Sequence, residues 1–158
     1  MLKLLASSAV FALVVAAAQP ARACDGMDEA AKGATTAQAA KPSIKTVTVD
    51  ELAARLAEAE KKKAALAVFD VNSAETRTSQ GIIPTAVLLP SSKDFDVALL
   101  PKNKGDGVVF YCSSEQCGAS KKAAKRALEA GHTDVSVLPA GIAGWVKAGK
   151  SVSKPSIS

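Results

Sequence analysis

The middle of the chain alternates short apolar runs with longer segments that mix apolar and polar residues. Continuous aliphatic or aromatic runs that are bounded by polar or turn-forming residues are typical of strands buried on both faces of a sheet. Five such runs predict strands: residues 46–49, 65–70, 86–90, 107–111 and 134–139. The first of them is β-branched throughout, and the third ends at a proline.

The segments between these runs favour helices. Thr48 and Glu51 have the T-x-x-E spacing of a capping box, so a helix is expected to begin there and to end in the basic residues 61–63. A second helix is predicted over residues 119–131, with apolar positions at the spacing of one helix face and a glycine as its end. A short closing helix is predicted over residues 142–149.

Repeated alternation of strand and helix predicts one α/β domain, with a mostly parallel central sheet flanked by helices on both faces. In such a fold the functional site lies beyond the carboxyl ends of the strands. Cys112 directly follows the run 107–111 and precedes the predicted helix 119–131. The sequence therefore places a thiol at the edge where a site is expected.

The two ends of the chain differ from this domain. Residues 1–23 resemble a secretory signal, with Lys3 as the basic start, an apolar run over 4–18 and an A-x-A site that ends at Ala23. We expect cleavage after Ala23 and a periplasmic or secreted protein. Residues 24–42 are small and polar and predict a flexible linker, residues 43–150 form the domain, and residues 151–158 predict a loose C-terminal tail.

Cys24 would be the first residue of the processed chain. A lipoprotein signal also ends at a cysteine, but it usually has a leucine-like residue three positions earlier, where this chain has Ala21. Contact with a membrane is therefore expected only if Cys24 is lipidated.

The net charge does not indicate a nucleic-acid partner. The chain has 20 basic and 15 acidic residues, a formal charge of +5. Removal of residues 1–23 takes away Lys3 and Arg22 and no acid, which leaves a charge of +3. This excess is small and its basic residues do not alternate with aromatic ones, so we expect no binding of nucleic acid.

The stretch FYCSSEQCG carries the candidate chemistry, because Cys112 and Cys117 are separated by four residues. Such a pair can be a disulfide, half of a metal site, or a reactive thiol with a second cysteine beside it. Zinc would need a second pair of ligands, and the one histidine, His132, lies at the end of a predicted helix. A phosphatase loop needs an arginine six residues after its cysteine, where this chain has Gly118. A thiol between a strand and a helix N-terminus is favoured as a thiolate, so the pattern favours Cys112 as a reactive group.

Four segments resemble the rhodanese (sulfurtransferase-like) family, in the family's order: residues 68–90, 108–112, 117–138 and 140–149. The resemblance extends over about residues 43–149. It implies a single rhodanese-like domain in which Cys112 is the catalytic cysteine, accepts a sulfane sulfur as a persulfide and passes it to a thiophilic acceptor. The partners would be a small sulfur donor or a thiol acceptor, including one on a protein, and no metal or organic cofactor is implied. The amides of the loop would hold the persulfide, and its residues are Ser113, Ser114, Glu115, Gln116, Cys117 and Gly118.

The loop departs from the family pattern in its charge. Family loops that act on thiosulfate usually carry arginine or lysine, whereas this one carries Glu115. Lys121 and Lys122 could compensate from the first turn of the following helix. Three other positions also differ from the usual arginine, histidine and glycine: Asn72, Ile82 and Thr85. We therefore expect thiosulfate to be a poor substrate.

Two further residues have predicted roles at the site. Cys117 is a candidate resolving thiol, which would convert a Cys112 persulfide to a disulfide, or it is a small side chain at the junction of loop and helix. Asp70 is expected to support the site from the end of its strand. Two alternatives to sulfur transfer stay open, namely a non-catalytic rhodanese-like binding module and a thiol–disulfide switch that uses Cys112 and Cys117.

Overall fold

The computed structural model describes residues 42–154. The predicted signal peptide, residues 24–41 of the predicted linker and residues 155–158 lie outside this range, so those predictions are not addressed by the structure. Within residues 42–154, no helix is both long enough and apolar enough to cross a bilayer.

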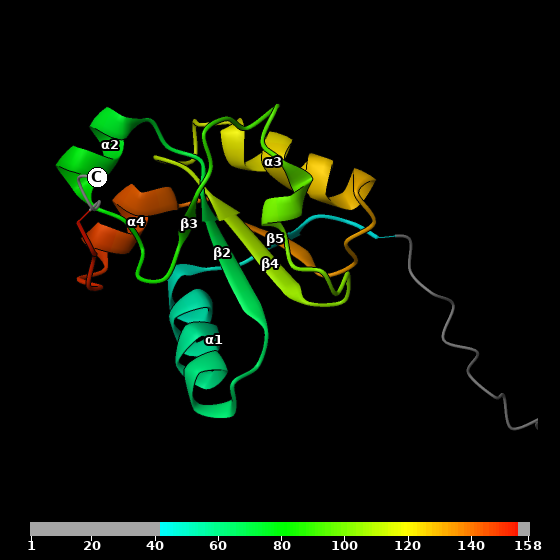
Figure 1. Cartoon of the computed structure of the whole chain (residues 1–158). Coiled ribbons are helices and arrows are strands. Elements are labelled where there is room, and N and C mark those ends of the chain that lie inside the picture. Colours follow the sequence, from blue (N-terminus) through cyan, green and yellow to red (C-terminus); the bar gives the residue numbers. More distant parts are fainter. Residues whose placement is uncertain (1–41, 155–158) are drawn as a thin grey trace, which may run out of the picture. The chain divides into compact units, whose positions relative to one another are not determined.

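A parallel sheet of five strands forms the centre of the domain (Figure 1). Its spatial order is β1-β5-β4-β2-β3, and every neighbouring pair is parallel. The strands are β1 (Lys45–Thr46), β2 (Leu66–Asp70), β3 (Val87–Leu88), β4 (Gly107–Tyr111) and β5 (Val135–Leu138). In the register of the two long inner strands, Asp70 at the end of β2 pairs with Tyr111 at the end of β4. The residues that follow these strands therefore meet at one edge of the sheet.

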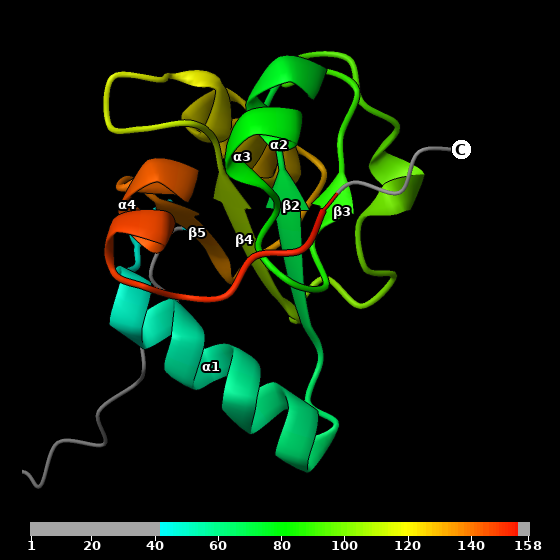
Figure 2. The same ribbon diagram turned by 90° about the vertical axis from the view of Figure 1, so that its left-hand side faces the viewer.

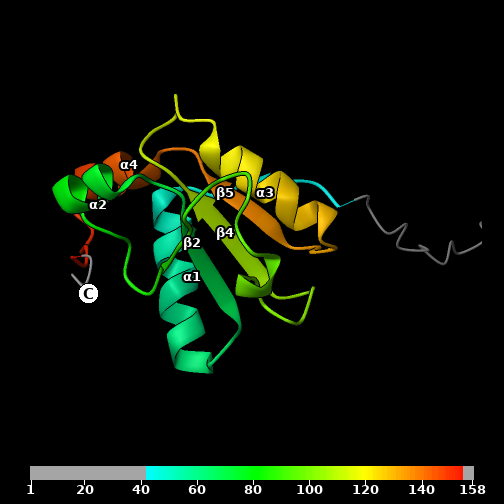
Figure 3. The same cartoon turned by 45° about the horizontal axis from the view of Figure 1, so that its top comes forward.

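Helices cover both faces of the sheet, as predicted (Figure 2). They are α1 (Val49–Lys62), α2 (Ala74–Gln80), α3 (Ala119–Glu129) and α4 (Gly141–Lys147), with a 3-10 turn, η1, at Val97–Leu99. Residues of α1 and α4 pack on one face of β2, β4 and β5, and residues of α3 pack on the other. Helix α2 lies beside α4 at the carboxyl end of the sheet (Figure 3).

The chemistry of the sequence accounts for the ends of α1. The Thr48 side chain accepts the amide of Glu51, and the Glu51 carboxylate accepts the amide of Thr48, so the predicted capping box is confirmed. The last turn carries Lys61 and Lys62, and Lys63 ends the helix in the left-handed conformation. Because acidic residues stand at the start and basic residues at the end, the charges complement the helix dipole.

Three predicted elements differ from the structure. Strand β1 is shorter than 46–49, because Val47 turns into the core and Thr48 caps α1. The run 86–90 gives only the short edge strand β3, whose two residues are each 39% exposed, so its prediction as a buried strand was wrong. Residues 151–154, expected as part of a loose tail, contact the domain instead. Ser153 exchanges two backbone hydrogen bonds with Ile82, and the Ser151 carbonyl accepts a hydrogen bond from the indole N–H of Trp145.

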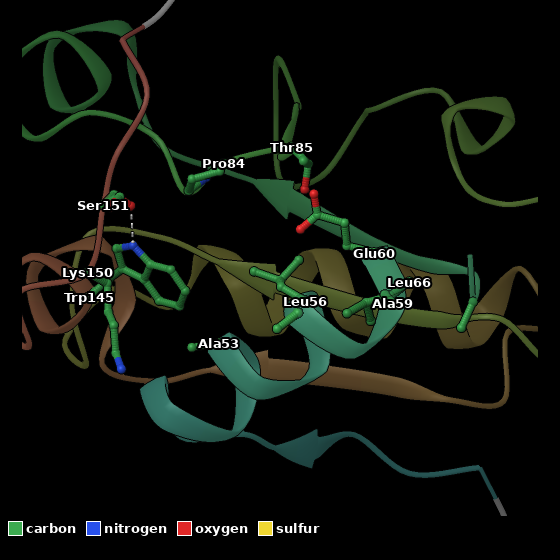
Figure 4. Close-up of a pocket in the computed structure, with 12 residues that line it drawn as sticks. Ala53, Leu56, Ala59, Glu60, Leu66, Pro84, Thr85, Trp145, Lys150 and Ser151 are labelled. Atoms are coloured by element: carbon green, nitrogen blue, oxygen red, sulfur yellow. Dashed lines mark hydrogen bonds between the residues drawn. The ribbon is translucent and has the colours of Figure 1, made fainter. Parts of the chain in front are cut away.

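A cavity of about 660 Å³ lies between α1, the segment before β3 and the segment after α4 (Figure 4). Leu56 and Trp145 form apolar walls, and Thr85 lies at its rim beside Pro84. No residue of the loop from Cys112 to Gly118, called the cysteine loop below, is among those that line this cavity. The cavity is thus separate from the edge of the sheet where the site was predicted.

Thr85 has φ of +68°, a left-handed conformation that is unfavourable for a β-branched residue. We expect Thr85→Gly to raise the free energy of unfolding by about 0.5–1 kcal/mol, because the relieved strain exceeds the entropy that glycine gains in the unfolded chain. Denaturant unfolding would measure the change. Thr85→Val keeps the branched side chain at the same exposed position, and an equal gain in that variant would contradict the explanation.

Candidate functional site

The loop from Cys112 to Gly118 joins the end of β4 to the start of α3, as predicted (Figure 2). Helix α4 holds its first two residues, because the amide of Ile142 donates to the Cys112 carbonyl at 2.8 Å and the amide of Ala143 donates to the Ser113 carbonyl at 3.0 Å. The free amides at the N-terminus of one helix thereby fix the backbone of the cysteine itself.

Gly141 makes this close contact between α4 and the cysteine loop possible. Its φ is +61°, and a Cβ at this position would overlap the Cys112 carbonyl oxygen and lie 2.7 Å from the carbonyl carbon and oxygen of Ser113. Only glycine combines that backbone conformation with the free space. The role of Gly141 was not predicted, although it lies in the segment 140–149 that carried part of the family resemblance.

The Cys112 side chain is buried, with 1% of its surface exposed. Its sulfur lies 3.2 Å from the Cys117 carbonyl oxygen, 3.8 Å from the Ser114 carbonyl oxygen and 3.7 Å from the Ser120 hydroxyl. Burial, and then a hydrogen bond to Cys117, raise the pKa of the Cys112 thiol above its ordinary value. The position of Cys112 in the sequence favoured a thiolate, whereas burial of its side chain and the two carbonyl oxygens that face its sulfur favour the protonated form.

Cys117 has the opposite environment. Its side chain is half-buried, and both cysteines are free thiols. Burial alone would raise the pKa of the Cys117 thiol, but hydrogen bonds from Cys112, from the amides of Ala119 and Ser113 and from the Ser113 hydroxyl outweigh it, so the pKa is lowered.

Asp70 is fully buried directly behind the loop. Its carboxylate accepts hydrogen bonds from the backbone N–H of Asn72 at 2.7 Å, from the Tyr111 hydroxyl at 2.6 Å and from the Arg77 Nε at 3.2 Å. Arg77 also donates to the carbonyls of Asp70 and Leu89. Asp70 thus links the end of β2 to the end of β4. It contacts the cysteine loop indirectly, because its partner Tyr111 immediately precedes Cys112. Arg77 was not predicted, although it is the arginine nearest in sequence to Asn72, where the family usually has one.

The charges around the loop are mainly negative on one side. A hollow of about 470 Å³ beside the loop is lined by Glu51 and Glu115, together with residues around the start of α1. Lys122 lies instead at a separate hollow of about 240 Å³, where it is grouped with Lys93 and Lys125. Among the described residues, the side chains of Lys121 and Lys122 make no hydrogen bond or ion pair with the cysteine loop, and only the backbone amide of Lys122 bonds to it, at the Gly118 carbonyl.

His132 is placed far from the thiols. It follows the C-terminal end of α3, whereas the cysteine loop precedes the start of that helix. The side chain is buried, and burial together with the nearby charge of Lys104 lowers its pKa. Among residues 42–154, no three His, Cys, Asp or Glu side chains are grouped as metal ligands would be.

The chain belongs to the rhodanese-like domain family. The sequence profile of that family matches residues 48–148, which include all of the elements from α1 to α4. No curated protein matches the chain.

Solved structures agree with this assignment of the fold. A rhodanese-like domain from Anabaena sp. is 25% identical, with a TM-score of 0.53 over 66% of this chain and 75% of that one. A protein from Bacillus halodurans is 23% identical, with a TM-score of 0.57 over 70% and 77% of the two chains. A protein from Rhodopseudomonas palustris, described as a possible tyrosine phosphatase, is 21% identical, with a TM-score of 0.53 over 80% and 99%.

Proposed function

We propose that this protein is a sulfurtransferase or sulfur carrier that holds sulfane sulfur as a persulfide on Cys112 and passes it to a thiophilic acceptor. The observation that carries the proposal is the position of Cys112. It stands first in the loop between β4 and α3 of a rhodanese-like domain, with its sulfur turned toward the inside of that loop.

Burial supports a storage role for Cys112. A persulfide on a side chain that is 1% exposed would be shielded from thiols in solution, which otherwise remove the outer sulfur. The Ser120 hydroxyl at 3.7 Å and the Ser120 amide are the donors near the sulfur, and both favour its anionic form. A persulfide is more acidic than its parent thiol, so these donors would stabilise it more effectively than they stabilise the thiol.

The charge distribution favours a sulfur donor other than thiosulfate. Thiosulfate is a dianion, and the hollow beside the loop is lined by the carboxylates of Glu51 and Glu115. A carboxylate within about 4 Å of one unit of negative charge costs on the order of 1–4 kcal/mol. A small organic persulfide carries no such double charge at its reacting end and is the donor class that the site fits better.

A phosphatase function is not favoured. Hydrolysis of a phosphate ester on a cysteine would need a group that clamps the phosphoryl oxygens, and the position six residues after Cys112 is Gly118. The loop contributes Glu115 and no cation.

Mass spectrometry of the mature protein after incubation with several sulfane donors tests the proposal. We expect a mass increase of one sulfur atom on the peptide that contains Cys112, lost again when cyanide is added as acceptor. The stable bound sulfur should fall at least about tenfold in Cys112→Ser, because the half-buried Cys117 would not shield a persulfide equally. A wild-type protein that forms no persulfide with any donor would refute the proposed function.

A further inference from the structure

We propose that sulfur enters this loop at Cys117 and is relayed from there to Cys112. This inference rests on the proposed persulfide function and assigns a separate step to each cysteine. The first argument is access, because attack on a donor needs the nucleophilic sulfur to lie in line with the S–S bond that breaks. Cys112 exposes 1% of its surface, whereas Cys117 is half-buried and lies between the exposed residues Gln116 and Gly118.

The second argument is the polarity of the groups that face each sulfur. The Cys112 sulfur lies near two carbonyl oxygens, those of Ser114 and Cys117, which favour a protonated thiol. The directions of the two pKa values agree: burial and a hydrogen bond to Cys117 raise the pKa of the Cys112 thiol, whereas hydrogen bonds to the Cys117 thiol lower its pKa although burial alone would raise it. Since the thiolate is the nucleophile, Cys117 is the better attacking group.

The start of α3 provides a third argument. This helix has 11 residues, and its N-cap residue Gly118 makes no side-chain hydrogen bond to the first amides. Cys117 immediately precedes this N-cap residue, and the Ala119 amide contributes to the lowered pKa of its thiol. Negative charge is stabilised at a helix N-terminus, so this position favours Cys117 as a thiolate.

The relay has two steps, and each is balanced without an oxidant. In the first, the Cys117 thiolate attacks the outer sulfur of a donor RS–SH, the donor S–S bond breaks, and RS⁻ leaves with its electron pair. In the second, the Cys112 sulfur attacks the outer sulfur of Cys117–S–SH. The Cys117 inner sulfur leaves with the bonding pair and takes the proton that Cys112 gives up. The Cys112 sulfur lies 3.2 Å from the Cys117 carbonyl oxygen, so the residue that gives up the proton and the residue that takes it are in contact.

Selective alkylation tests the order of reactivity without any sulfur donor. Wild-type protein is treated with substoichiometric iodoacetamide at pH 7, and labelled peptides are quantified by mass spectrometry. We expect Cys117 to be labelled at least about tenfold faster than Cys112, because it is more accessible and a thiolate is the reactive form of cysteine. Faster labelling of Cys112 would overturn the inference.

Transfer from one equivalent of glutathione persulfide, followed by rapid quenching, tests the relay itself. In wild type the sulfur should end on Cys112, and in Cys112→Ser it should be found on Cys117. In Cys117→Ser and Cys117→Ala, loading of Cys112 should slow at least tenfold. Loading in these variants at the wild-type rate would overturn the relay but leave persulfide storage on Cys112 intact, whereas a wild type that loads neither cysteine would refute the proposed function and the relay together.

A matched control separates chemistry from a general disturbance of α3. Lys125 lies on the helix that follows the loop, and its exposed side chain pairs with Glu129 of the same helix. Lys125→Ala should load Cys112 within about twofold of wild type. If Lys125→Ala slowed loading as strongly as Cys117→Ser does, the effect would belong to the stability of the helix and the entry role of Cys117 would be wrong.

Discussion

Gly141→Ala is expected to lower the free energy of unfolding by about 3 kcal/mol, through left-handed backbone strain and overlap with the cysteine loop. The added methyl group would meet the backbone carbonyls of Cys112 and Ser113, which cannot rotate away as a side chain can. Either α4 or the loop must therefore move. We expect a fall in the thermal midpoint of roughly 10 °C, measured by calorimetry.

The same change should affect the thiols, because the amides of Ile142 and Ala143 bond the first two carbonyls of the loop. Displacement of these bonds would open the loop and expose Cys112. We expect iodoacetamide to label Cys112 at least about fivefold faster in Gly141→Ala than in wild type, by the general dependence of thiol reactivity on access.

Gly149→Ala is the matched control. Gly149 also has a left-handed backbone, with φ of +70°, but a Cβ there would meet no atom within 4 Å. This variant should lose only the strain component, about 1 kcal/mol, with no change in Cys112 labelling. Equal losses in the two variants would show that contact with the loop does not contribute.

The order of elements was predictable because buried parallel strands have a simple composition. β4 coincides with the run 107–111, and the capping box at Thr48 fixes where α1 begins. The edge strand was less predictable. Residues 86–90 have the composition of a core strand, but only Leu89 is buried, because the order of the strands places β3 outside the sheet's centre, and a single sequence does not encode that order locally.

The site was predictable in position and less so in chemistry. A cysteine after a strand and before a helix lies at the functional edge of an α/β sheet wherever the fold is correct. Which thiol has the lowered pKa depends on the path of the loop and on the docking of α4 against Cys112 and Ser113. These contacts join residues 30 positions apart, Ile142 with Cys112 and Ala143 with Ser113, so no local pattern indicated that Cys117 has the more favourable environment for a thiolate.

Asp70→Asn is expected to lower the free energy of unfolding by about 3–4 kcal/mol, because it removes the negative partner of a buried charge. Arg77 is 13% exposed in its side chain and has the Asp70 carboxylate as its ion-pair partner. Asp70 is also surrounded by hydrogen-bond donors, among them the Tyr111 hydroxyl and the backbone N–H of Asn72. The side-chain NH2 group of the new asparagine is itself a donor, so it would face at least one of them without an acceptor. Urea unfolding would measure the loss.

Tyr111→Phe tests how much of that loss passes through the strand that carries Cys112. The Tyr111 hydroxyl accepts the Ile83 amide at 3.1 Å and donates to Asp70, so its removal leaves one buried N–H and one carboxylate oxygen without this partner. The expected loss is about 1–3 kcal/mol, smaller than for Asp70→Asn because the ion pair with Arg77 is retained. If the free energy of unfolding fell no further in Asp70→Asn than in Tyr111→Phe, the buried ion pair would contribute nothing measurable to stability. The carboxylate would then matter to the site only as the acceptor that fixes Tyr111, and with it the residue that immediately precedes the cysteine loop.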